Sequence, residues 1–214
     1  MSIDLYSGTP GSGKSLHLAR EILDYCRLPK NRLVISNFDV DRSKLKNPDR
    51  FICLENDEIT PDYLIKVGLE RLPMWDNYSQ LENSIILIID ECQLMFNARS
   101  WNESGRKDWI KFFTQHRKLG YKILLVAQFD LMIDKQIRSL IDIQYVHRKL
   151  SDLGVVCKLL KIITRSDIFI AIEIFYPIKM KTGSRLFRAH KKYYSLYDTC
   201  NLFNSLDDKG VNDE

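Results

Sequence analysis

The sequence predicts an α/β fold in which helices flank a mainly parallel central sheet that continues into an antiparallel C-terminal extension. Up to about residue 150, apolar strand-like segments alternate with helical segments, an order typical of a parallel sheet. Ile85–Ile89 contains only isoleucine and leucine, which predicts a central strand covered on both faces. After Gly154, two apolar segments follow each other with only a Ser-Asp turn between them, which predicts antiparallel strands.

The N-terminal elements are a strand, a glycine-rich loop and a helix. Ile3–Ser7 is a short apolar strand that leads directly into the loop. After Ser15, apolar residues recur at helical spacing until Pro29 ends the predicted helix. These apolar residues are Leu16, Ala19, Ile22, Leu23 and Cys26.

The middle of the chain continues the alternation. Leu33–Ile35 and Phe51–Leu54 are predicted strands, and Thr60 is predicted to cap a helix from Pro61 to about Leu72. A polar segment, Asn97–Arg106, is predicted to be a loop. The remaining predicted elements are a helix over Asp108–Leu119 capped by Gly120, a strand over Lys122–Gln128, a short helix over Phe129–Leu140, a strand over Ile143–His147, and the paired strands Gly154–Arg165 and Asp167–Pro177.

The 214 residues, of which 45% are hydrophobic, suffice for one large domain. We expect residues 1–150 to form the core, residues 151–200 a strand extension of the same domain, and residues 201–214 a flexible acidic tail. The five cysteines are scattered without a CxxC pair, which favours a reducing compartment over a metal site. The sequence has no recognisable signal peptide or apolar membrane span and therefore indicates a cytoplasmic chain.

The segment YSGTPGSGKS holds three of the nine glycines of the chain and matches the GxxxxGK[ST] motif of phosphate-binding loops (P-loops). Its position between a strand and a helix is the context that the motif requires. Glycine lets backbone N–H groups converge on phosphate oxygens, and the helix N-terminus adds the positive end of its dipole. An ordinary glycine turn is the alternative. The predicted nucleotide-binding residues are Gly8, Thr9, Pro10, Gly11, Ser12, Gly13, Lys14, Ser15 and Leu16.

The motif and two later acids predict ATP and Mg²⁺ as ligands. Lys14 is predicted to reach the β and γ phosphates and to act in catalysis, and Ser15 Oγ to ligate Mg²⁺. Asp90 and Glu91 follow the Ile85–Ile89 strand, where P-loop proteins hold Mg²⁺ with an acid. Asp90 is therefore a predicted metal ligand, and Glu91 a predicted catalytic residue that orients or deprotonates the attacking water. A helix N-cap is the alternative role for the two acids.

Three further residues are candidate catalytic groups. Gln128 ends a buried strand and could contact the γ phosphate, although a structural hydrogen bond explains it nearly as well. Arg117 and Arg138 are candidates for an arginine that completes the transition state, and a surface role is the default for each. An arginine finger acting on a neighbouring copy would explain a ring of identical chains. His116 and His147 are expected to be structural.

A basic stretch covers residues 135–192, which carry 13 Lys/Arg and 4 Asp/Glu interleaved with aromatic residues. By itself this composition favours the solvated basic face of an alternating sheet. A surface for a polyanion, such as single-stranded DNA or anionic lipid, is the sharper alternative.

Four segments in this order resemble the zonula occludens toxin (Zot) family, which includes the gene I assembly proteins of filamentous phage. They are YSGTPGSGKS, IILIIDECQ, QHRKLGYKILLVAQ and LMIDKQIRSLID. The resemblance implies a P-loop NTPase fold of the additional-strand ATPase type. For the site it implies nucleotide contacts from Lys14 and Ser15, metal and water acids at Asp90 and Glu91, a sensor at Gln128 and a first finger candidate at Arg138.

The resemblance also implies a function. Members of the family are ATPases at the cytoplasmic face of the inner membrane, where they work with a membrane-embedded exit channel to assemble and extrude single-stranded DNA phage. The expected partners of this chain are copies of itself in a ring, that exit-channel protein, single-stranded DNA or phage nucleoprotein, and an anionic membrane surface.

Two other functions share some of these features. A small-molecule phosphotransferase, such as a nucleotide kinase, uses the same loop, but it needs an acceptor site and an arginine-rich lid that the sequence does not display, and Glu91 argues against it. A secreted ligand of cell junctions without enzymatic activity is the third hypothesis. The missing signal peptide and the unpaired cysteines oppose it.

Overall fold

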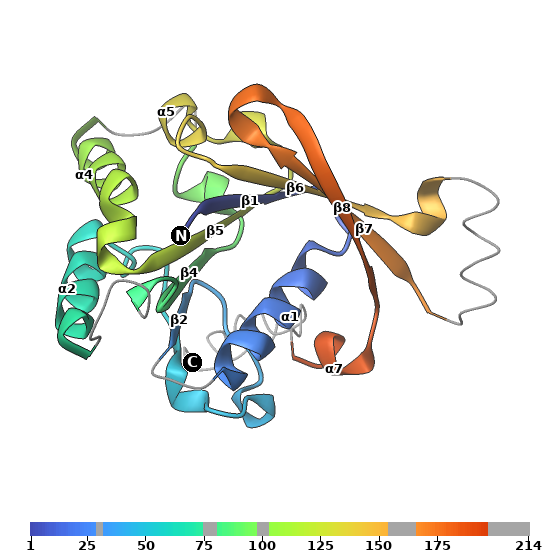
Figure 1. Ribbon diagram of the computed structural model, residues 1–214, viewed down its shortest axis with the longest axis horizontal. Helices are drawn as coiled ribbons and strands as arrows, with labels where there is room; N and C mark the ends of the chain where they lie inside the picture. Colours follow the sequence, from blue (N-terminus) through green and yellow to red (C-terminus); the bar gives the residue numbers. More distant parts are fainter. Residues whose placement is uncertain (29–31, 75–80, 98–102, 154–165, 197–214) are drawn as a thin grey trace, which may run out of the picture.

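Eight strands form one sheet in the computed structural model (Figure 1), which describes residues 1–28, 32–74, 81–97, 103–153 and 166–196. Within these ranges the strand order is β3-β2-β4-β5-β1-β6-β7-β8. Strands β3 to β6 in this order are parallel, whereas β7 is antiparallel to both of its neighbours. The strands are β1 Ile3–Ser7, β2 Leu33–Ser36, β3 Phe51–Cys53, β4 Ile85–Ile89, β5 Tyr121–Ala127, β6 Ile143–Lys149, β7 Ile168–Phe175 and β8 Met180–Arg188.

This order confirms the predicted fold class. Strand β5 lies between β1 and β4, so one additional strand separates the strand before the glycine loop from the strand before the two acids. All residues of β1 and β4 are buried, because helices cover both faces of the parallel sheet. The registers Ser7↔Ala127 and Ile89↔Leu125 place the carboxyl ends of these strands at one edge of the sheet.

Helices cover the two faces of the sheet (Figure 1). Successive residues of a strand point to opposite faces, so Leu5 packs in the core under α2 and α4 whereas Tyr6 packs in the core under α1. None of the helices in the described ranges is long and apolar enough to cross a membrane. The helices are α1 Lys14–Arg27 and α7 Lys191–Tyr194 on one face, and α2 Pro61–Arg71, α4 Glu103–Gln115 and α5 Lys135–Arg138 on the other.

Local capping signals in the sequence have the predicted structural effect. Thr60 Oγ1 accepts a hydrogen bond of 3.3 Å from the N–H of Tyr63 at the start of α2. Gly120 adopts a left-handed conformation with φ of 78° and ends the helical segment that continues α4. The predicted elements up to β6 are confirmed, with the two exceptions that follow.

Helix α4 begins at Glu103, inside the segment predicted to be a loop up to Arg106. A polar segment containing glycine carries no helix signal, but Arg106 Nη2 donates to Asp134 Oδ2 at 2.7 Å and so anchors the first turn. The predicted helix over Phe129–Leu140 is also wrong. Asp134 caps the separate short helix α5 by accepting from the N–H of Gln136 at 2.8 Å.

The C-terminal extension is antiparallel as predicted, but its pairing differs. Strand β7 pairs with β6 on one edge and with β8 on the other, so the predicted pairing of β7 with Gly154–Arg165 is wrong. Strand β8 was not predicted, because an exposed edge strand shows neither an apolar run nor clear alternation. Residues 154–165 and the predicted acidic tail at 201–214 lie outside the described residues.

Candidate functional site

The glycine-rich loop connects β1 directly to α1. Its backbone is braced by two hydrogen bonds, from Ser12 N–H to Thr9 O at 3.1 Å and from Gly8 N–H to Gln128 O at 3.2 Å. Gly13 is the N-cap residue of α1, and no side chain caps this end of the helix. The N-terminus of α1 therefore faces the loop with its backbone donors, as a phosphate site requires.

Glycine is required at two loop positions for steric reasons. Gly8 has φ of 146°, and a Cβ there would lie 2.5 Å from the carbonyl oxygen of His147 on β6. Gly13 has φ of 94°, and a Cβ there would lie 2.6 Å from the ring of Phe169 on β7. The loop is therefore packed closely against the β6–β7 side of the sheet.

Lys14 is folded back onto the loop. Its Nζ donates to Gly8 O at 2.6 Å and to Thr9 O at 3.3 Å, and the residue is only 9% exposed. Burial lowers the pKa of Lys14, while the charges of Glu91 and Asp90 act in the opposite direction. The lysine therefore lies in the electrostatic field of both acids, so the structure brings these three predicted residues together.

Asp90 follows β4 and is held at its backbone by a residue that sequence reasoning missed. Asn37 follows β2, the neighbouring strand, and its side-chain amide contacts both backbone groups of Asp90. Asn37 Oδ1 accepts from Asp90 N–H at 2.7 Å, and Asn37 Nδ2 donates to Asp90 O at 2.8 Å. The sequence does show a polar residue directly after each of these two buried strands, which could have pointed to Asn37. That the two strands are neighbours, however, is known only from the sheet order.

Glu91 has a backbone conformation that is uncommon for a residue with a side chain. Its φ is 45° and its ψ is 44°, in the left-handed region. Such strain persists only where the surrounding structure imposes it, and it is frequent at functional sites. Asp90 Oδ1 accepts from Glu91 N–H at 2.9 Å, and Glu91 Oε2 accepts from Gln93 Nε2. Gln93 thus orients the Glu91 carboxylate, a contact for which the sequence carries no recognisable signal.

The residues proposed for Mg²⁺ fit that ion in their chemistry. Ser15 follows Lys14 in the first turn of α1, and Asp90 lies at the same edge of the sheet. A hydroxyl and a carboxylate are hard oxygen ligands, and Mg²⁺ in such sites takes its other ligands from phosphate and water. No group of three or more His, Cys, Asp or Glu side chains within the described ranges could hold a metal alone.

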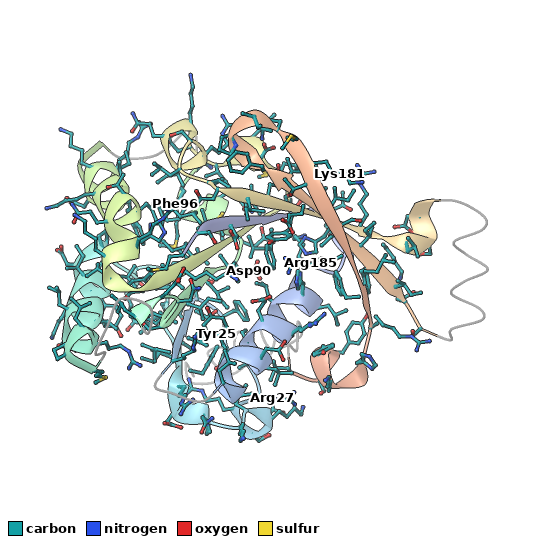
Figure 2. All side chains as sticks on the ribbon, in the orientation of Figure 1. Tyr25, Arg27, Asp90, Phe96, Lys181 and Arg185 are labelled. Atoms are coloured by element: carbon teal, nitrogen blue, oxygen red, sulfur yellow. The ribbon has the colours of Figure 1, made fainter. Side chains whose placement is uncertain are left out.

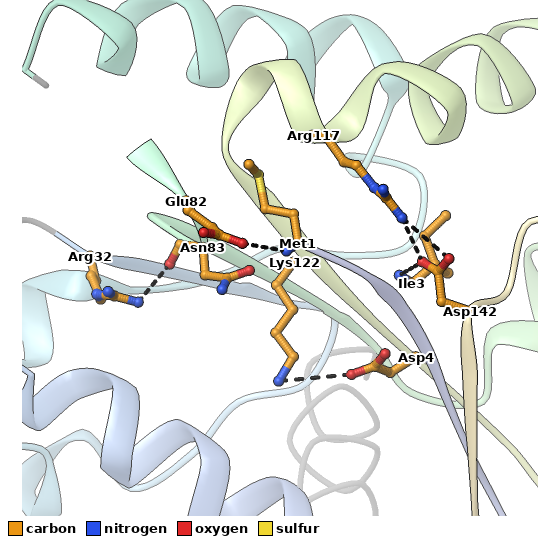
Figure 3. Close-up of polar contacts among 9 residues, drawn as sticks. All are labelled: Met1, Ile3, Asp4, Arg32, Glu82, Asn83, Arg117, Lys122 and Asp142. Atoms are coloured by element: carbon orange, nitrogen blue, oxygen red, sulfur yellow. Dashed lines mark hydrogen bonds and ion pairs between the residues drawn. The ribbon is translucent and has the colours of Figure 1, made fainter. Parts of the chain in front are cut away.

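Gln128 lies beside the loop, but the two arginines do not. A cavity of about 240 Å³ is lined by Gln128 together with Thr9 and Arg148. Arg117 pairs with Asp142 at 3.2 Å at the amino end of β1 (Figure 3), the end opposite to the loop. Arg138 lines a separate surface cavity beside Asp130, Tyr176 and Lys179. Within the described chain, neither arginine is brought to the phosphate loop.

Two buried histidines pack beside the glycine-rich loop. His17 on α1 and His147 on β6 are joined by a hydrogen bond of 2.9 Å between Nδ1 and Nε2. The Tyr6 ring stacks on His17, with ring centroids 4.8 Å apart. Burial lowers the pKa of each histidine to about 3, so both are neutral at physiological pH. The structural role predicted for His147 agrees with this packing.

The sheet order and the arrangement of loop and acids define the fold as that of P-loop ATPases. A family model described as Zonular occludens toxin (Zot) matches residues 2–199. The chain therefore belongs to the Zot family. The Gene 1 protein of Enterobacteria phage M13 is 29% identical over 225 residues, which cover 99% of this chain and 63% of that relative. This chain thus spans less than two thirds of the length of that relative.

Solved structures share the fold. The N-terminal domain of zonular occludens toxin from Neisseria meningitidis has a TM-score of 0.51 at 21% identity, covering 92% of this chain and 98% of that chain. The genome packaging NTPase B204 from Sulfolobus turreted icosahedral virus 2, in complex with AMPPCP, has a TM-score of 0.51 at 12% identity, covering 86% of this chain and 96% of that chain. The DNA-packaging ATPase B204 from Sulfolobus turreted icosahedral virus has a TM-score of 0.53 at 14% identity, covering 88% of this chain and 98% of that chain.

Proposed function

We propose that the chain is an ATP-hydrolysing motor that drives assembly and extrusion of a filamentous single-stranded DNA phage. One observation carries the enzymatic part of this proposal: Lys14 lies in the electrostatic field of Asp90 and Glu91, and these acids directly follow β4, which is separated from β1 by β5 alone. A loop alone would bind phosphate. An acid that can activate water beside the loop supports hydrolysis.

The residues act on ATP in distinct ways. The backbone N–H groups of the loop and the α1 N-terminus hold the phosphates, and Lys14 exchanges its contacts with Gly8 O and Thr9 O for phosphate oxygens. Ser15 and Asp90 would hold Mg²⁺, which supplies charge stabilisation to the phosphates when bound. Glu91 orients a water for attack on the γ phosphorus and accepts its proton, and the bond from the γ phosphorus to the β-phosphate oxygen breaks.

The phage-assembly part of the proposal is supported by membership of the Zot family and by the similarity to a Gene 1 protein of a phage. We place the chain at the cytoplasmic face of the inner membrane with a membrane-embedded exit-channel protein as partner. The outer strand β8 exposes Lys181, Arg185 and Arg188, and Figure 2 labels the first two along this strand. This basic strand is a candidate contact for single-stranded DNA, nucleoprotein or anionic lipid.

A motor of this type is tested by coupling between ATP turnover and its cargo. We expect single-stranded DNA to stimulate ATP turnover and to shift the chain toward a ring in sedimentation experiments. Stimulation should weaken as salt concentration rises, because the DNA contact is electrostatic. A chain that hydrolyses ATP as a monomer with no response to DNA would contradict the motor and leave a simple ATPase.

The ring predicts that an arginine acts on the neighbouring copy. Arg138 is the first candidate, since within one chain it lies in a cavity apart from the loop. We expect Arg138→Ala and Lys14→Ala proteins to be inactive alone and to regain turnover when mixed, because each supplies the part that the other lacks. A mixture without any recovered turnover argues against Arg138 acting in trans, and Arg117→Ala is then the variant to mix.

A further inference from the structure

A cavity of about 360 Å³ adjoins the phosphate loop and is lined by residues from four separate parts of the chain. One wall is the loop and the start of α1, from Gly11 to Leu16. The other walls are Lys149 at the end of β6, Phe169 on β7, and Tyr193 and Tyr194 on α7. Its volume falls in the range of about 300–1,000 Å³ that small-molecule sites occupy.

The position of this cavity relative to the acids suggests what it holds. In the sheet order, Asp90 and Glu91 follow a strand on the β5 side of β1, whereas the cavity lies on the β6–β7 side. A triphosphate that lies along the loop with its γ end at the acids has its other end directed to the cavity. We propose that the nucleobase and ribose of the bound nucleotide occupy this cavity and that the base stacks on Tyr194. This inference rests on the proposed function.

The charge of the cavity agrees with a neutral occupant. Lys149 Nζ is paired with Asp167 Oδ2 at 2.9 Å, and this partner raises the pKa of the lysine. The lysine's positive charge is therefore compensated within the chain. Anion binding is favoured at the loop, where Lys14 contacts only neutral carbonyl groups in its hydrogen bonds, and not at the far wall of the cavity.

Phe169 forms a fixed floor. It is 3% exposed and stacks on Phe187 of β8 with ring centroids 5.6 Å apart and an interplanar angle of 23°. Its ring also lies against the backbone of Gly13, which leaves no room for a Cβ. The floor is therefore rigid and in contact with the loop that holds the phosphates.

Tyr194 forms an exposed wall on an anchored segment. Helix α7 lies beside α1 (Figure 1), and the two residues after Tyr194 tie it down: Leu196 is 1% exposed, and Ser195 O accepts from Lys44 Nζ at 2.6 Å. Tyr194 itself remains 52% exposed. An aromatic ring that is held in place yet accessible is what stacking with a base requires, since every base has a π-face.

The test compares two ligands that share the triphosphate and differ in the base. We would measure dissociation constants of the Mg²⁺ complexes of AMPPCP, the β,γ-methylene analogue of ATP, and of inorganic tripolyphosphate. Tyr194→Ala should weaken the analogue about tenfold, from the loss of stacking, and leave tripolyphosphate unchanged. Tyr194→Phe, which keeps the ring, should bind both ligands like wild type, as should the control Leu69→Ala, which removes a side chain of similar exposure on α2.

Two results would overturn the inference. The first is a Tyr194→Ala protein that binds AMPPCP as wild type does. The second is a Tyr194→Ala protein whose affinities for AMPPCP and for tripolyphosphate fall by the same factor. The substitution would then weaken binding of the triphosphate at the loop and not of the base. Unfolding curves establish that each variant is folded. A wild-type chain that binds neither ligand contradicts the proposed function itself, so the two failures are distinguishable.

Discussion

The two ends of the central strands differ in how their charged side chains are paired. At the amino end (Figure 3), charges meet opposite charges: Arg117 with Asp142 at 3.2 Å, Lys122 with Asp4 at 3.8 Å, and the N-terminal ammonium with Glu82 at 3.0 Å. At the carboxyl end, Lys149 on β6 also has an ion partner, Asp167 at 2.9 Å, but beside the glycine-rich loop Lys14 donates to two backbone carbonyls and Glu91 accepts from the amide of Gln93.

Under the proposed function, this difference separates a structural set of charges from a reactive one. An ion pair within the chain offsets part of the charge of both partners, so the amino end offers a ligand less uncompensated charge. A charge held by neutral groups keeps its field and can act on phosphate or water. The carboxyl edge of a parallel sheet is also where loops and helix N-termini meet, which is why ligands of such folds bind there.

The largest expected effect is a loss of ATP turnover, and it is tested by replacing one lysine at each end of the strands. Lys14→Ala should lower ATP turnover about 100-fold or more, because its charge is lost from the phosphate site. Lys122→Ala, at the opposite end, should leave turnover unchanged while lowering thermal stability, because it leaves the buried Asp4 without its ion partner. Steady-state phosphate release and melting curves measure both. Equal losses of turnover in the two variants would break the distinction between the ends.

A second test concerns the fit of the loop against β7. Gly13→Ala should raise the dissociation constant for AMPPCP about tenfold or more and lower the free energy of unfolding by about 2 kcal/mol, because the new Cβ meets Phe169 at a positive φ. The matched control is Gly105→Ala in α4, where a Cβ meets nothing within 4 Å. This control should bind normally and gain roughly 0.5 kcal/mol in stability. Normal binding by Gly13→Ala would show that close packing of the loop is dispensable.

The smallest expected effect is a pH dependence of stability. His17 and His147 have an ordinary pKa of 6.5 and a folded pKa of about 3, so between these values the unfolded chain binds more protons and acid destabilises the fold. Asp4, whose pKa is raised from 3.8 to about 6 by burial, acts in the opposite direction below pH 6 but counters only one histidine. The free energy of unfolding should fall by about 1 kcal/mol per pH unit below pH 6.

Denaturant titrations at pH 7 and pH 5 measure this dependence. His190→Ala removes an exposed histidine and should keep the same slope. Equal unfolding free energies at the two pH values would contradict the lowered pKa values of His17 and His147 in the folded chain.

The sequence predicted the features that depend on neighbouring residues in the chain. Strand β4 was evident because a strand buried on both faces is apolar throughout, and the phosphate loop because its chemistry is confined to one segment. Strand β8 was missed because a solvated edge strand carries no such pattern. The contact made by Asn37 and the role proposed for Tyr194 could not be predicted. The first depends on β2 lying next to β4, and the second on α7 packing beside α1.

The most direct test of the central claim is whether Glu91 separates ATP binding from ATP turnover. Glu91→Gln keeps the shape of the side chain but cannot accept a proton, so turnover should fall about 100-fold or more while AMPPCP binds as it does to wild type. Parallel measurements of phosphate release and of AMPPCP affinity decide the question. A Glu91→Gln protein that binds and hydrolyses like wild type would contradict the claim that this acid makes the phosphate loop a hydrolase site.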